Sequence, residues 1–505
     1  MGAVKSYEKI LKNISSKKDI DVYLHIMLGI GYAHTELSNI INKEENALKA
    51  IAAFKDVLGK ADTGKHKKEI ALALKYMGHC YMYLSNVRDI KANIANALNA
   101  FEKSLNYIIK EENPLEYADL QRLKAWPYYA LSLVENSNDN ISYALEACEE
   151  ALVVYTVERY PNEFASIKKI QGVLFISLYS ISENSEYIKN AFNAFDDALN
   201  VASMDKEPDL YAFIQNYRGT AYEYLLGKEP SDENFQRGIE AFLEAQKVYT
   251  IERNPIGYAY SYNHLGIIYL YMSTVKDSTD HAKKALECFM EASKVFNIEQ
   301  YPLDYALLQS DIGGAYNILA RSGDFETNYN KAVESFKNAL GILTIDKYPT
   351  LFAKTNVELG KVYSSADSQH ARFEDIYKSV ECYEEALKVF TPEDEPVMYA
   401  YTQSNKVMAL LKLALAKRDP VKNIMKAIDA SEEAIRVFTY VDNLYFCGTA
   451  YINLGDLYRI LAVYENREEN LKRAEACYDE ALKIFTDEDF HSYYNILMQR
   501  KELLQ

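Results

Sequence analysis

Seven of the eleven prolines in this 505-residue chain stand at one position of a repeat. Each is 47 residues from the next: Pro114, Pro161, Pro208, Pro255, Pro302, Pro349 and Pro396. A period of this length is typical of arrays built from one small structural unit, because each copy needs its neighbours to bury its apolar face. The repeat therefore overrides the prior of about three separate domains that chain length alone would give.

The same spacing governs a helical pattern of the form Ala-x-x-x-aromatic-x-x-Ala, as in Ala285, Phe289 and Ala292. Its central position recurs every 47 residues, with one step of 48 between Tyr383 and Ser431. That position holds Tyr7, Phe54, Phe101, Cys148, Phe195, Phe242, Phe289, Phe336, Tyr383, Ser431 and Tyr478. Apolar residues around it follow i, i+3, i+4 spacing, which predicts an amphipathic helix, here called helix B.

A second pattern, Leu-Gly-x-x-Tyr, precedes the first in each repeat, as in Leu265, Gly266 and Tyr269, and predicts a helix A. Its glycines in register are Gly78, Gly172, Gly219, Gly266, Gly313, Gly360 and Gly455. Ala125 and Val407 replace glycine in two repeats, and the first repeat leaves Gly29 and Gly31 as alternatives. Because glycine inside a helix costs about 1 kcal/mol relative to alanine, we expect a neighbouring helix to approach closely there.

The residues expected at the starts of the helices also recur with the repeat. The repeated proline falls where the first turn of helix A is expected, and this is the position in which a helix tolerates proline. Asparagine recurs at the expected start of helix B, where we predict that its side chain caps free N–H groups. These residues are Asn46, Asn93, Asn140, Asn234, Asn328, Asn423 and Asn470. Each repeat is therefore predicted to be a pair of helices.

The predicted fold is an all-α, right-handed α-solenoid of about eleven repeats and about 22 helices, forming one array over residues 1–505. It is expected to start with helix B of a partial repeat (1–18) and to end with a cap of helix A type (488–505). Because the chain begins inside a repeat, we expect either that residue 1 is an artificial start or that an N-terminal region was removed.

The succession of Leu-Gly-x-x-Tyr, Ala-x-x-x-Phe-x-x-Ala and Pro resembles the tetratricopeptide repeat over essentially the whole chain. The family's usual repeat has about 34 residues, so longer helices and loops are expected here. The 47-residue form, with Tyr301, Pro302, Tyr305 and Ala306 at its joint, is similar to arrays found beside caspase-like (CHAT) peptidase domains. This resemblance implies a protein-binding array in which the A helices line a groove.

Carried over residue by residue, the family's groove positions select nine candidates for peptide binding. They are Lys75, Arg122, Trp126, Tyr129, Lys169, Phe213, Asn216, Tyr260 and Asn263. Lys75, Arg122 and Lys169 form a basic run that suits carboxylates of an acidic peptide. Asn216 and Asn263 suit the backbone of an extended peptide, since an amide both donates and accepts hydrogen bonds. Trp126 is a residue type that often dominates binding energy.

Composition excludes several other functions. The net charge of -17 argues against a general nucleic-acid or membrane binder, because both need a basic face. Six cysteines without a CxxC pair, and no signal peptide, indicate a cytoplasmic protein. Cys288, Cys382 and Cys477 occupy a position that holds alanine in other repeats, so packing explains them better than metal or redox chemistry. No metal site, cofactor or catalytic motif is expected.

We therefore predict a non-catalytic scaffold that binds a protein or peptide. One alternative is a regulatory or sensor region of a larger effector, such as a caspase-like peptidase. A second is a nucleotide-binding enzyme that uses the P-loop-like segment from Gly59 to His66. The second is disfavoured because His66 stands where a P-loop needs Ser or Thr, and a helix rather than a strand precedes the segment.

Overall fold

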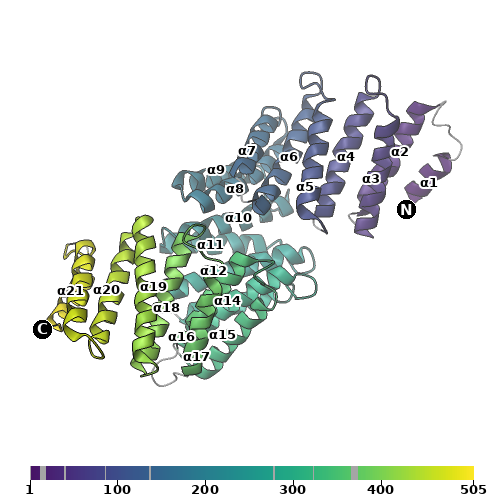
Figure 1. Ribbon diagram of the computed structural model, residues 1–505. Helices are drawn as coiled ribbons and strands as arrows, with labels where there is room; N and C mark the ends of the chain where they lie inside the picture. Colours follow the sequence, from purple (N-terminus) through teal and green to yellow (C-terminus); the bar gives the residue numbers. More distant parts are fainter. Residues whose placement is uncertain are drawn as a thin grey trace. The chain divides into compact units, whose positions relative to one another are not determined.

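The computed structural model describes residues 2–11, 19–38, 41–85, 87–135, 138–276, 279–321, 323–365, 373–488 and 490–504. Within these ranges the chain forms 22 α-helices and no strand. Figure 1 shows the ribbon as coiled helices joined by loops. The prediction of an all-α array is therefore confirmed. The helices alternate along the chain between the two predicted types.

The A helices are α2 (Ile20–Ser38), α4 (Lys67–Ser85), α6 (Pro114–Glu135), α8 (Pro161–Ser182), α10 (Pro208–Leu226), α12 (Pro255–Val275), α14 (Pro302–Ala320), α16 (Pro349–Ser364), α18 (Pro396–Leu415), α20 (Leu444–Leu461) and α22 (His491–Glu502). The B helices are α1 (Gly2–Leu11), α3 (Lys43–Lys60), α5 (Ile90–Leu105), α7 (Asn138–Leu152), α9 (Ser185–Leu199), α11 (Asp232–Gln246), α13 (Thr279–Ala292), α15 (Phe325–Leu340), α17 (Phe373–Ala386), α19 (Pro420–Tyr440) and α21 (Arg467–Ile484).

The chain divides into two compact parts, an N-terminal half (Met1–Gly257) and a C-terminal half (Tyr258–Gln505). In each half an A helix packs on the B helix that follows it, and that B helix packs on the next A helix. Each half is thus an all-α solenoid of stacked helix pairs. The predicted partial repeat contains α1, and the predicted cap contains α22, while the continuity of one array across residues 1–505 stays a prediction.

The repeated proline starts the A helices as predicted. All seven register prolines are the first residues of their helices, from Pro114 in α6 to Pro396 in α18. The first turn of a helix leaves its N–H groups without partners inside the helix, so the missing N–H of proline costs nothing there. The 47-residue spacing of these prolines therefore sets where these A helices begin.

Close contact explains the repeated glycine. A Cβ atom added to Gly172 would lie 2.2 Å from the ring of Phe195, and one added to Gly266 would lie 2.5 Å from Phe289. Real Cβ atoms do not come this close, so the aromatic ring of helix B requires glycine in helix A of the same repeat. The two alternatives in the first repeat are both used, since Gly31 faces the ring of Phe54 and Gly29 faces the ring of Tyr7.

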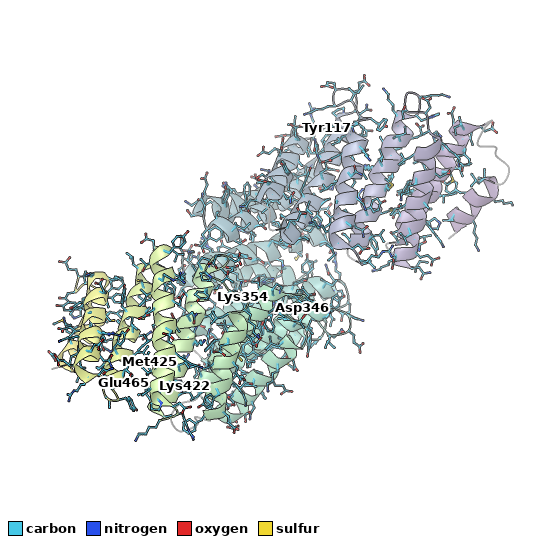
Figure 2. The ribbon with its side chains drawn as sticks, viewed as in Figure 1. Tyr117, Asp346, Lys354, Lys422, Met425 and Glu465 are labelled. Atoms are coloured by element: carbon cyan, nitrogen blue, oxygen red, sulfur yellow. The ribbon has the colours of Figure 1, made fainter. Side chains whose placement is uncertain are left out.

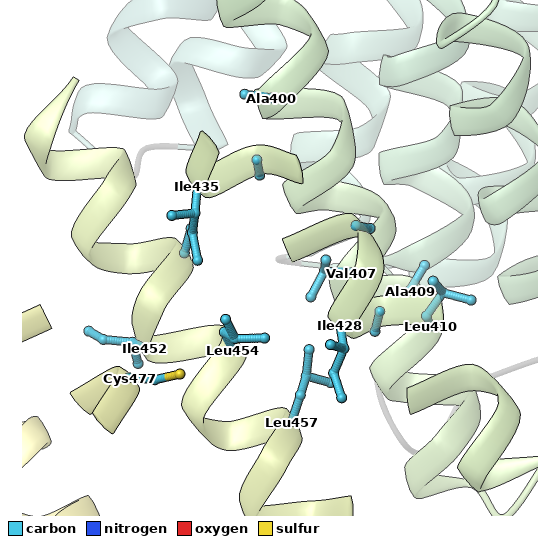
Figure 3. Packing of buried hydrophobic residues seen from close by; sticks show 14 of the residues in the cluster. Ala400, Val407, Ala409, Leu410, Ile428, Ile435, Ile452, Leu454, Leu457 and Cys477 are labelled. Carbon is cyan, nitrogen blue, oxygen red and sulfur yellow. The ribbon is translucent and has the colours of Figure 1, made fainter. Parts of the chain in front are cut away.

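Two repeats fill the same space differently. Where Ala125 replaces glycine, the aromatic position holds Cys148, and where Val407 replaces glycine, that position holds Ser431. All four residues are buried. A larger side chain on helix A is thus matched by a smaller one on helix B, which keeps the packed volume similar. Figure 3 shows Val407 with Ile428 and Leu457 in the apolar cluster that α18, α19 and α20 share.

The predicted capping role of the repeated asparagines is wrong. Asn93 is the fourth residue of α5, and its side-chain amide donates to the carbonyl oxygen of Arg88 at 2.8 Å. Asn46, Asn234, Asn423 and Asn470 donate in the same way to the residue five positions earlier. The asparagine therefore lies inside helix B, and its side-chain amide holds a carbonyl oxygen of the preceding loop.

A tyrosine near the start of helix A also contacts the end of helix B in the same repeat. The hydroxyl of Tyr23 donates to Asp56 at 2.6 Å, and that of Tyr211 donates to Glu244 at 3.0 Å. Tyr117, labelled in Figure 2, bonds to Glu150 at 3.2 Å. Each pair is separated by 33 residues, so this hydrogen bond closes a single repeat on itself.

In the part of the chain that the structure describes, α8 is the one helix long and apolar enough to cross a membrane by length and composition. Half of its apolar window is buried inside the protein. Ile167, Leu174 and Ile176 are among its buried residues, and they belong to the apolar clusters around α8. Burial in the solenoid accounts for this hydropathy.

Candidate binding faces of the A helices

The nine predicted groove residues are divided between the two halves. Seven lie in the N-terminal half: Lys75 on α4, Arg122, Trp126 and Tyr129 on α6, Lys169 on α8, and Phe213 and Asn216 on α10. Tyr260 and Asn263 lie on α12 in the C-terminal half. Each set is described by itself.

One carboxylate neutralises part of the basic run. Asp119 accepts a hydrogen bond from the ammonium of Lys75 and, at 2.5 Å, one from the guanidinium of Arg122. Burial favours the neutral acid, but these two cations outweigh it, so the pKa of Asp119 is lowered. The three predicted cations therefore bring a net charge of about +2 rather than +3 once Asp119 is counted, and Lys75 is paired with Asp119.

Lys169 lacks such a counter-ion. Among the described residues it forms no ion pair, and its ammonium lies 4.6 Å from the centre of the Phe213 ring. Burial, followed by the positive charge of Arg122, lowers the pKa of Lys169. The Nε atom of Arg122 is also buried without a hydrogen-bond partner in this part of the structure. Positive charge on this face is consequently least compensated between Arg122 and Lys169.

Aromatic side chains stand beside these cations. The rings of Trp126 and Tyr129 are 5.3 Å apart between centroids, and Trp126 remains 37% exposed. Phe213 stacks on Tyr217 at 4.5 Å. Burial raises the pKa of Tyr129, which keeps its hydroxyl protonated and available as a donor. This face, called the α4–α10 face below, thus combines Lys75, Asp119, Arg122, Lys169 and their aromatic neighbours.

The predicted asparagines supply unused acceptors. The side-chain oxygens of Asn216 and Asn263 are both buried and have no hydrogen-bond partner among the described residues. A buried polar atom without a partner costs on the order of 1–3 kcal/mol. A donor placed beside either oxygen would remove that cost, and the binding role of both residues stays a prediction.

Tyr260 and Asn263 line a cavity of about 490 Å³ in the C-terminal half. Its walls come from α12, α14 and α16, and apolar surface is supplied by Ile267, Leu270, Leu307 and Leu351, together with Phe296 from the segment after α13. Its polar residues include Asn263, Asp304, Ser310, Asp311, Lys354, Thr355 and Glu358. Lys354 is exposed and is labelled in Figure 2. Cavities of this size hold small molecules or single large side chains.

Two features of these faces were missed from the sequence. The role of Asp119 as counter-ion had a signal, because it stands three residues before Arg122 and therefore on the same helix face. The cavity also had a signal in the sequence, because Gly314 directly follows the register glycine Gly313. No pattern in the sequence showed that Lys169 would remain without a carboxylate.

The P-loop-like segment is internally satisfied. The backbone N–H groups of Gly64 and Lys65 both donate to the side chain of Asp62, each at 2.9 Å. His66 is buried, accepts from the N–H of Asp62 and contacts Asp21 at 2.8 Å. A phosphate site needs such N–H groups free to point at the ligand. This geometry disfavours the nucleotide-binding alternative.

Cys288, Cys382 and Cys477 are buried, in agreement with the packing role predicted for these three. All six are buried and form no disulfide. Burial raises the pKa of Cys148 and of Cys288 to about 12, so both thiols stay protonated. A protonated, buried thiol is a poor nucleophile and a poor metal ligand.

No family model and no curated protein matches this chain. Among solved structures it is similar to the human IFIT1 dimer with m7Gppp-AAAA, at 16% identity over 95% of this chain and 94% of that one, with a TM-score of 0.43. It is also similar to the STAND protein PH0952 from Pyrococcus horikoshii, which has a tetratricopeptide repeat sensor. That match has 15% identity over 100% and 74% of the two chains, with a TM-score of 0.45. The match to yeast Tom70 has 15% identity over 94% of this chain and 96% of that one, with a TM-score of 0.33. Scores at this level leave the function to be inferred from the side chains of this chain.

Proposed function

We propose that this protein is a non-catalytic, cytoplasmic scaffold whose α4–α10 face binds an extended acidic segment of a protein partner. The observation that carries the proposal is Lys169, a half-buried cation without a carboxylate, placed over the Phe213 ring and within the field of Arg122. A buried charge without a partner is costly, and proteins retain such charges mainly where a ligand completes them.

A carboxylate side chain of the partner would complete this arrangement. It would accept charge-assisted hydrogen bonds from Lys169 and Arg122, which are about twice as strong as neutral ones. The unused oxygen of Asn216 would accept from a backbone N–H of the same segment. Trp126 and Tyr129 would pack on its apolar atoms, since exposed aromatic side chains are frequent anchors of interfaces.

The same face serves the alternative of a regulatory region in a larger effector, such as a caspase-like peptidase. A sensor also needs a surface that recognises one kind of segment. Nucleic acid and membrane stay outside the proposal because of the acidic net charge of -17 and the carboxylate of Asp119 within the face.

The test compares two neighbouring lysines on α8. Lys169→Gln removes the uncompensated charge, whereas Lys168→Gln removes a charge that is paired with Asp197 at 3.0 Å. The probe is a fluorescein-labelled peptide that alternates glutamate and glycine, measured by fluorescence anisotropy beside the same peptide with glutamine in place of glutamate. We expect Lys169→Gln to weaken binding about tenfold and Lys168→Gln to change it less than about twofold.

Three results would contradict the proposal. They are equal binding of the glutamate and glutamine peptides, equal loss in both variants, and tighter binding of a single-stranded RNA oligonucleotide than of the acidic peptide. In the RNA case the affinity should also fall steeply with salt. Melting temperatures of both variants show whether a loss of binding reflects unfolding.

A further inference from the structure

The cavity of the C-terminal half owes its open space to Gly314. In the other repeats, the position after the register residue holds His79, Trp126, Val173, Thr220, Ile267, Lys361, Met408 or Asp456. Gly314 alone has no side chain at this position among these repeats, and it lines the cavity. A side chain of the usual size at this point of α14 would occupy part of the 490 Å³.

Helix packing does not require this glycine. A Cβ atom on Gly313 would lie 2.7 Å from the ring of Phe336, so Gly313 is fixed by the helix contact. A Cβ atom on Gly314 would meet only Leu270, at 3.6 Å, which is an ordinary van der Waals distance. Glycine nevertheless costs about 1 kcal/mol in a helix interior. Gly314 therefore carries a cost that the fold does not explain and that the cavity does.

The charges around the cavity favour a cation. Asp304, Asp311 and Glu358 line it, against Lys354 as the lining lysine. Lys361 lies outside the lining and pairs with Glu358 at 2.7 Å, so Asp304, rather than Glu358, is the lining carboxylate that favours a cation. Asp304 accepts a hydrogen bond from the hydroxyl of Tyr260 at 2.6 Å, and its orientation is thereby fixed.

A missing donor points the same way. The buried side-chain oxygen of Asn263 has no hydrogen-bond partner in the described structure, and Asn263 lines the cavity. Ser310 and Thr355, whose hydroxyls are 3.4 Å apart, supply further acceptors. The apolar side chains of Ile267, Leu270 and Leu307 surround the remaining space. The cavity thus offers acceptors, negative charge and an apolar wall in one place.

We propose that this cavity binds a singly charged organic cation, an ammonium or guanidinium group carried on an apolar stem. The N–H groups of the cation donate to Asn263 and approach the carboxylate of Asp304, and the stem packs on Ile267, Leu270 and Leu307. The chemistry is the same whether the cation is a free small molecule or the side chain of a basic peptide. The site is separate from the α4–α10 face, and its test does not depend on that face.

Titration calorimetry on the full chain tests this with phenethylamine and its neutral analogue 2-phenylethanol. We expect the amine to bind at least about tenfold more tightly than the alcohol. The peptide acetyl-glycyl-arginyl-glycinamide distinguishes the two sources: tighter binding than the amine assigns the site to a peptide side chain, and weaker binding assigns it to a free amine.

Two variants locate the binding. Gly314→Ile fills the cavity with a side chain that Ile267 already places at the same position, so binding of every probe should fall at least about tenfold. Asp304→Asn keeps the shape and removes the charge, so it should weaken the amine and leave the alcohol unchanged. Asp209→Asn, in the first turn of α10 and paired with Arg253, is the matched control and should change neither.

The proposal is overturned if amine and alcohol bind alike, or if neither phenethylamine nor the arginine peptide binds the wild-type chain. Unchanged amine binding in a folded Gly314→Ile variant would overturn it as well. If that variant proves unfolded by circular dichroism, the comparison of Asp304→Asn with Asp209→Asn decides the question alone.

Discussion

The residue after the register position separates the α4–α10 face from the cavity of the C-terminal half. On α4 and α6 it is His79 and Trp126, two large rings, and on α14 it is Gly314, without a side chain. The residue three positions before the register position differs as well, being Arg122 on α6 and Ser310 on α14. The α4–α10 face therefore carries large rings and positive charge at these positions, whereas α14 leaves space there beside lining carboxylates.

This difference indicates that separate positions of a repeat hold its helices together and form its exposed or cavity-lining surface. The glycine, the facing aromatic ring and the starting proline recur in most repeats and hold the helices together. The residue after the register position varies in size and charge from repeat to repeat. Four experiments test how strictly this separation holds.

The largest effect is expected at His79. Burial foremost, and then the charge of Lys75, lowers the pKa of His79 from 6.5 to about 4. The unfolded chain binds this proton more readily than the folded chain. The contribution of neutral His79 to the free energy of unfolding is therefore fully present above about pH 6.5, and it is lost as the pH falls towards about 4. The loss attributable to this group reaches about 3 kcal/mol. Urea unfolding at several pH values should show a shallower acid loss for His79→Gln than for the wild type, and parallel curves would refute this.

The second effect concerns Ala125 and Cys148, the pair that replaces glycine and the aromatic ring in one repeat. Introducing the usual ring with Cys148→Phe should cost about 2 kcal/mol, because Ala125 occupies the space that glycine leaves elsewhere. Adding Ala125→Gly should recover more than half of that loss. Denaturant unfolding of both single variants and of the double variant measures the coupling. Strictly additive effects would show that the two positions do not share one space.

The third effect has the opposite sign. Gly314→Ala should raise the free energy of unfolding by up to about 1 kcal/mol, since the added Cβ atom meets only an ordinary contact. Gly313→Ala is the control and should be destabilising, because its Cβ atom would meet Phe336 at 2.7 Å. Thermal unfolding of the two variants measures both effects. A change of stability in the same direction for both would contradict the predicted difference between these neighbouring glycines.

The smallest effect is expected at Lys169. Lys169→Met keeps the length of the side chain and removes a charge whose pKa burial has lowered, so stability at neutral pH should rise by roughly 0.5 kcal/mol. The gain should shrink as alkaline pH deprotonates Lys169 in the wild type, before the unfolded chain loses that proton near pH 10.5. A stability loss in this variant would show that Lys169 is already compensated within the fold.

Much of the fold was predictable because its determinants are local and repeated. Helix starts at Pro161 and Pro302, and the need for glycine at Gly172 and Gly266, follow from single-residue sterics that the period makes visible. The asparagine prediction failed because Asn93 has two ways to satisfy a helix start, and only the path of the preceding loop selects between them.

The binding faces were predictable only in part. Register placed Lys75, Arg122 and Lys169 on neighbouring A helices, but the pairing of Lys75 with Asp119 depends on the distance between α4 and α6. The cavity likewise depends on what several helices leave unfilled around Gly314. A one-dimensional pattern records which residues share a face and does not record the volume between them.

The tyrosine that closes several of the repeats on their own carboxylate has a consequence for how the chain tolerates change in length. Tyr117 and Glu150, like Tyr211 and Glu244, are partners inside one repeat, so neither depends on how many repeats precede or follow. Loss or duplication of a whole 47-residue segment would leave every such bond intact, whereas an insertion of half that length would separate the partners. Array length is thereby free to evolve in whole steps.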